Sequence, residues 1–97
     1  MKPIRQGDVI LLPVKPVEGL PESGLTLARG EVTGHRHRIS QGDAQLFTKE
    51  GNLYLRIFSA NALLAHEEHG SITVPQGHWM VRIQREYEPE GWRYVAD

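Results

Sequence analysis

The stretch PQGHWMVRIQREY, residues 75–87, decides the fold class of this chain. A turn around a proline and a glycine is followed by a regular alternation of apolar and polar side chains. The apolar face holds Trp79, Val81, Ile83 and Tyr87, and the opposite face holds His78, Arg82, Gln84 and Glu86. A period of two is typical of a β-strand buried on one face. The pattern therefore predicts a strand over residues 78–87.

Similar short runs recur along the chain, separated by turn residues. They predict further strands at residues 7–14, 25–32, 35–39, 44–48, 53–59 and 92–95. Residues 15–24 contain two prolines and two glycines, and are predicted to form an exposed loop. Strands spaced about 8–12 residues apart suggest a small barrel or sandwich. We expect an all-β fold, a small single-domain β-barrel over residues 1–97, because closing a sheet removes its edges.

The stretch SANALLAHEEHG, residues 59–70, allows two interpretations. Ser59 and Gly70 are suitable caps for a short helix near residues 60–69. Alternatively, residues 62–66 pair with residues 71–74 as a hairpin. The strands predicted on both sides favour the hairpin.

Composition excludes several function classes. The chain has no cysteine, so it forms no disulfide or thiolate metal site, and we expect a cytoplasmic protein. Eleven lysines and arginines against 12 acidic residues give a net charge of −1, which does not favour nucleic-acid binding. We find no signal peptide and no apolar run long enough for a membrane span, and expect no membrane association.

The histidines are the main candidates for chemistry. All five are candidate metal ligands: His35, His37, His66, His69 and His78. In a strand, alternate residues share a face about 6.6 Å apart, so the first two could converge on one ion. A third imidazole would complete a three-histidine site with an open position for water. We therefore predict a divalent metal cofactor, with zinc as the first choice.

Two acidic residues lie between the second pair of histidines. Glu67 and Glu68 are the candidate catalytic residues, as a general base beside a metal-bound water or as partners that orient an imidazole. This pattern suggests a metal-dependent hydratase or hydrolase, for example one that hydrates carbon dioxide. The same residues would also suit an unmetallated polar surface.

Residues 8–34 resemble the start of the chaperonin-10 (co-chaperonin) family. The similar features are DVILLPV, a loop that ends in SGLTL, and RGEV. The resemblance implies a small β-barrel and a ring-shaped oligomer, with Leu25 and Leu27 docking a partner. It underlies an alternative function: a non-enzymatic, homo-oligomeric accessory protein that binds a protein partner through the loop at residues 15–27.

A second resemblance is to the cupins. The HRH motif at residues 35–37 resembles their first histidine pair, and GSITVPQG at residues 70–77 resembles a cupin strand and turn. The cupin glutamate after the histidine pair has no counterpart, and His78 follows Gly77 directly instead of standing three residues beyond it. The resemblance thus implies a barrel whose strands carry histidines. A barrel that binds an apolar ligand or a sugar without metal is a third possibility.

Overall fold

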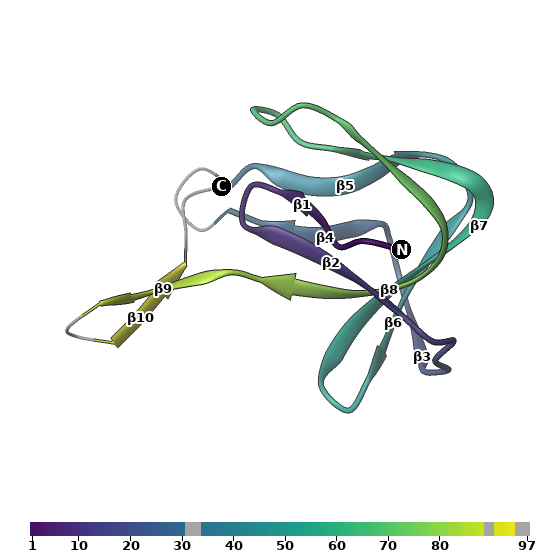
Figure 1. Ribbon diagram of the computed structural model, residues 1–97, viewed down its shortest axis with the longest axis horizontal. Helices are drawn as coiled ribbons and strands as arrows, with labels where there is room; N and C mark the ends of the chain where they lie inside the picture. Colours follow the sequence, from purple (N-terminus) through teal and green to yellow (C-terminus); the bar gives the residue numbers. More distant parts are fainter. Residues whose placement is uncertain (31–33, 89–90, 95–97) are drawn as a thin grey trace.

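The computed structural model describes residues 1–30, 34–88 and 91–94, with the side chains of residues 1–30 and 34–84. The prediction of an all-β chain is confirmed (Figure 1). In chain order the strands are β1 (Ile4–Gln6), β2 (Val9–Val14), β3 (Leu20–Glu22), β4 (Thr26–Arg29), β5 (Arg36–Gln41), β6 (Ala44–Lys49), β7 (Asn52–Ala65), β8 (Ile72–Ile83), β9 (Arg85–Glu88) and β10 (Gly91–Tyr94). No helix long and apolar enough to cross a membrane is found in this part of the chain.

Eight of these strands form one antiparallel sheet. Its main path runs β1-β2-β8-β7-β5-β4, while β6 pairs with β7 and β3 pairs with β6. The sheet therefore branches at β7, whose first half pairs with β6 and whose second half pairs with β5. The predicted closed barrel is wrong for this reason: over the described residues, the end strands β1 and β4 do not pair with each other.

The ambiguous stretch forms a hairpin, and the alternative helix at residues 60–69 is wrong. In the register of β7 and β8, Ala62 lies opposite Val74 and Leu64 lies opposite Ile72. Ala62, Leu64 and Val74 are buried, so the alternation continues to the end of β7. A helix would have taken these side chains out of the sheet core.

The strand predicted at residues 78–87 covers the second half of β8 and most of β9. β8 begins at Ile72, ends at Ile83, and is followed by β9 after a break at Gln84. Trp79 and Val81 are buried in the core, as the alternation predicted.

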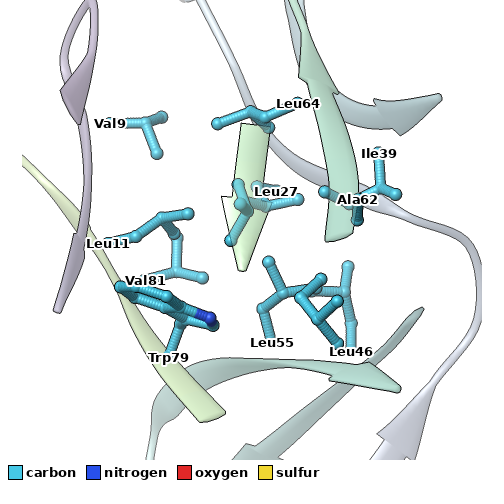
Figure 2. Packing of buried hydrophobic residues seen from close by; sticks show 12 residues of the cluster. Val9, Leu11, Leu27, Ile39, Leu46, Leu55, Ala62, Leu64, Trp79 and Val81 are labelled. Atoms are coloured by element: carbon cyan, nitrogen blue, oxygen red, sulfur yellow. The ribbon is translucent and has the colours of Figure 1, made fainter. Parts of the chain in front are cut away.

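The core lies inside the curved sheet. Figure 2 shows its side chains, which come from β2 and β4–β8. The members of the cluster are Val9, Leu11, Leu27, Ile39, Leu46, Leu55, Ile57, Ala62, Leu64, Val74, Trp79 and Val81. The burial of these apolar side chains is the main driving force for folding the sheet on itself.

The segment at residues 15–27 is more ordered than a mobile loop. It contains β3, which pairs with β6. Leu27 belongs to the core, and Leu25 is partly buried and packs against it. The leucine exposed in this segment is Leu20, at 74%.

Candidate functional site

Four of the five predicted ligands gather beyond the end of β7. We call His35, His37, His66 and His69 the histidine cluster. The His37 and His66 ring centroids are 4.3 Å apart, and the His66 and His69 centroids are 4.6 Å apart. The His35 ring stands edge-on to His66 at 5.5 Å. The β7–β8 turn thus brings both sequence pairs together within one chain (Figure 1).

His37 is the centre of this site and is fully buried, with 0% exposure. Its Nδ1 lies 2.9 Å from Oε1 of Gln6, and its Nε2 lies 3.1 Å from Oδ1 of Asp8. Gln6 and Asp8 flank the glycine of the β1–β2 turn, and both are buried. These side chains connect β5 to the β1–β2 turn, where no backbone ladder joins them.

The Gln6 amide fixes the proton on one side of the His37 ring. Its Nε2 donates to the carbonyl oxygens of Leu64 and Gly70, each at 3.0 Å. The amide oxygen is therefore left to accept, and Nδ1 of His37 carries a proton and donates to it. A hydrogen bond between Nε2 of His37 and the Asp8 carboxylate then requires one further proton.

The pKa of His37 depends on its burial and on three neighbouring side chains, His66, Asp8 and His69. Burial lowers the pKa of His37, and the nearby His66 lowers it further, whereas Asp8 acts in the opposite direction. The net result is a pKa of His37 below its ordinary value.

His66 has a structural role in the turn. Its Nδ1 accepts the backbone N–H of Glu68 at 3.0 Å and that of His69 at 3.2 Å. A neutral His66 with these bonds carries its proton on Nε2. The ring therefore caps the β7–β8 turn.

Gly7 allows the rings to approach the β1–β2 turn. A Cβ at this position would lie 2.6 Å from Nε2 of His69 and 3.3 Å from Cε1 of His37. Its φ of 57° also lies in the left-handed region that favours glycine. The glycine thus leaves room for the His37 and His69 rings beside the β1–β2 turn.

The two predicted catalytic residues lie at the outer side of the cluster. Oε2 of Glu67 accepts the backbone N–H of Arg36 at 2.8 Å, and this bond lowers the pKa of Glu67. Oε1 of Glu68 lies 3.4 Å from Nδ1 of His35. A carboxylate with a lowered pKa is a weaker base, so the geometry favours a positioning role for Glu67.

His78 does not join the cluster. It lies opposite Arg56 of β7, its Nδ1 accepts the backbone N–H of Val17 at 3.2 Å, and its ring stands edge-on to Phe47 at 6.2 Å. Burial and the charge of Arg56 both lower the pKa of His78. This histidine therefore contacts Val17 and Phe47, two residues that line a separate groove.

The cluster offers nitrogen and oxygen donors but is not arranged as a finished metal site. No three histidine or acidic side chains within residues 1–30 and 34–84 stand together in a metal-ligating geometry. Sequence reasoning missed Gln6 and Asp8. Their signal was weak, because Gln6 ends a strand of three residues that is too short to show an alternation, and Asp8 lies in the turn after it.

Comparison with known proteins gives a family without an assigned activity. No curated protein and no solved structure matches the chain. Residues 5–84, which include β2 to β8 and the whole histidine cluster, match the family model described as "Domain of unknown function (DUF8820)". The chain therefore belongs to this family.

Proposed function

We propose that this protein binds a divalent transition metal at the histidine cluster, with zinc as the expected ion. The observations that support this most directly are the contact of His37 with Asp8 and the approach of the His37 and His69 rings to Gly7. Donors of this kind suit zinc and its neighbours in the first transition row.

His37 and Asp8 supply the first two ligand atoms of the proposed site. Their facing atoms are 3.1 Å apart. Two ligand atoms bound tetrahedrally to one zinc at about 2.0–2.1 Å lie about 3.3 Å from each other. The two atoms are thus already close to the separation of two ligands of one zinc ion. The bound ion would replace the proton between them. Binding is then coupled to the release of a proton.

The orientation of the His37 ring is fixed by Gln6. Metal-ligating histidines usually donate their second ring N–H to an oxygen acceptor, which fixes the ring and its tautomer. Gln6 supplies that acceptor, and is itself held by two backbone carbonyls. His37 is thus oriented as a ligand through Nε2.

His69 and His66 are the candidates for the remaining ligands. Nε2 of His69 would lie 2.6 Å from a Cβ at Gly7, and Cε1 of His37 would lie 3.3 Å from the same point, so the half-buried side chain of His69 is the candidate for the third ligand. His66 is engaged through Nδ1 by the turn. We therefore assign His37, Asp8 and His69 as ligands and leave the fourth position to water or a reoriented His66.

The test is zinc binding to chelator-treated protein, measured by elemental analysis and isothermal titration calorimetry. The wild type should bind one zinc per chain, and a His69→Ala variant should bind at least about tenfold more weakly, since it loses one ligand. The matched control is His78→Asn, which removes a histidine outside the cluster and should bind like the wild type. Equal zinc affinity of the His69→Ala variant and the wild type, or no saturable binding to the wild type, would contradict the proposal.

A further inference from the structure

A second feature lies along the first half of β7, away from the histidine cluster. Here the segment at residues 17–21 lies against β6 and β7 and encloses a cavity of about 300 Å³. We call it the Arg56 groove, and its walls include Val17, Gly19, Pro21, Phe47, Arg56 and Phe58. In Figure 1 it corresponds to the end of the molecule where β3 and β6 lie.

The wall of the groove is held in place by three separate contacts. β3 pairs with β6, and the N–H of Val17 donates to Nδ1 of His78 at 3.2 Å. At Gly19 the backbone packs so closely that a Cβ would lie 2.3 Å from the Thr48 carbonyl oxygen. A cavity built from paired strands and close packing is preformed, as sites for small molecules usually are.

The lining is aromatic at both levels of the groove. The Phe47 ring is buried and stacks on Tyr54, with centroids 5.5 Å apart. The Phe58 ring, also part of the lining, is 45% exposed, which is unusual for a large apolar side chain on a sheet. Flat apolar molecules pack well on such rings.

Arg56 supplies the positive charge at the rim of the groove. Its guanidinium carbon lies 4.4 Å from the centroid of the Phe58 ring. It forms no ion pair with any side chain of the described residues, although Glu18 also lines the groove. An arginine that lies over an aromatic ring, beside an apolar cavity, can present its fork of N–H donors to a carboxylate.

We propose that the Arg56 groove binds a small aromatic carboxylate, whose ring enters between Phe47 and Phe58 and whose carboxylate pairs with Arg56. The cavity volume lies at the lower end of the range for small-molecule sites, which suits a ligand of one or two rings. The groove is independent of the histidine cluster, so this site stands whether or not the protein binds metal.

The test uses a matched pair of probes, 2-naphthoate and its uncharged analogue 2-naphthamide, followed by amide chemical shifts and calorimetry. Naphthoate should shift the amide signals of Val17, Gly19 and Phe58 and bind about tenfold more tightly than naphthamide, the difference expected for a charged hydrogen bond. An Arg56→Gln variant should remove this preference, and Phe58→Ala should weaken both probes.

Two results would overturn the proposal. One is equal affinity of the wild type for both probes, which would show that Arg56 does not select an anion. The other is no saturable shift of the groove amides up to low millimolar naphthoate, which would show that the cavity is not a site for such a ligand. The control variant is Arg82→Gln, an exposed arginine outside the groove lining, which should keep the preference.

Discussion

The histidine cluster and the Arg56 groove lie along the two halves of β7, and they differ in how their polar groups are satisfied. In the cluster, the buried His37 has an acceptor at each ring nitrogen, from Gln6 and Asp8. In the groove, Arg56 has an aromatic ring beneath it but no carboxylate paired with it over the described residues. One site is closed and internally bonded, whereas the other is open and incomplete.

This difference has a consequence for stability and for binding. Removing a partner from a closed polar network leaves other buried groups unsatisfied, which is expensive. Removing an exposed cation from an open groove leaves nothing unsatisfied behind it. Substitutions in the cluster should therefore lower the free energy of unfolding. Substitutions in the groove should change the ligand preference and leave the free energy of unfolding nearly unchanged.

The largest effect is expected from His37→Leu. The substitution fits a buried apolar side chain but deprives Gln6 and Asp8 of their common partner, so the free energy of unfolding should fall by about 3 kcal/mol or more. Urea unfolding followed by circular dichroism measures this change. The comparison variant in the groove, Arg56→Gln, should stay within about 0.5 kcal/mol of the wild type.

A second substitution tests the shared proton. Asp8→Asn supplies an amide N–H that donates to Nε2 of His37, so the contact is kept without a charge. We expect Asp8→Asn to cost clearly less stability than His37→Leu but to abolish zinc binding. A loss of stability as large as that of His37→Leu would mean that the Asp8 charge itself holds the fold together.

Zinc should stabilise the wild type by the next largest amount. At a free concentration about 100 times the dissociation constant, a ligand specific for the folded state adds about 2.7 kcal/mol. A thermal unfolding series with increasing zinc should show this rise in the wild type and, because its site is at least about tenfold weaker, a rise smaller by about 1.3 kcal/mol or more in His69→Ala at the same zinc concentration. A rise of the same size in both proteins would place the ion elsewhere.

Gly7→Ala should produce a smaller effect that depends on its neighbours. Both Gly7 and Gly51 have positive φ, of 57° and 80°, but a Cβ on Gly7 meets the His69 ring, whereas a Cβ on Gly51 meets open space. The backbone cost for alanine is about 1–2 kcal/mol at either site. We expect Gly7→Ala to lose about 1 kcal/mol more than Gly51→Ala in urea unfolding, because His69 must move. Equal losses would show that the space above Gly7 is not occupied as described.

The sequence predicted the strands well because their signals are local. The alternation around Trp79 and Val81 predicted a buried face, and the flanking strands predicted the β7–β8 hairpin correctly. Closure of the barrel was wrong because it depends on strand order. The sharing of one edge of β7 by β5 and β6 leaves no trace in the alternation of any single strand.

The site was predicted only in part for a related reason. Two histidines spaced two apart on a strand and two more at a turn were visible in the sequence, and the structure brings them together. The partners of His37 were not visible, because Gln6 and Asp8 are far from β5 in the sequence, at the end of a very short strand and in the turn that follows it. His78 looked equivalent to the others, but it lies opposite Arg56, where it contacts Val17 and Phe47 beside the groove.

The smallest expected effect is a dependence of stability on pH that arises in the groove. The pKa of His78 is lowered by burial and by Arg56, so in the folded protein it lies below the unfolded value of 6.5. Between these two values the unfolded chain binds more protons, and the free energy of unfolding therefore falls as the pH is lowered through this window. Protonation at Nδ1 also removes the acceptor for the Val17 N–H.

Two variants separate this contribution from that of the histidine cluster, since His37 has a pKa shifted in the same direction. His78→Asn keeps an acceptor near Val17 but does not titrate, so its stability should fall less steeply on acidification than that of the wild type. Arg56→Gln should raise the pKa of His78, measured by proton NMR, but leave it below that of an exposed histidine, because burial remains. If both variants lose stability with acid as steeply as the wild type, the pH dependence belongs to the cluster alone. The groove would then be a binding surface that contributes nothing to the response of the fold to pH.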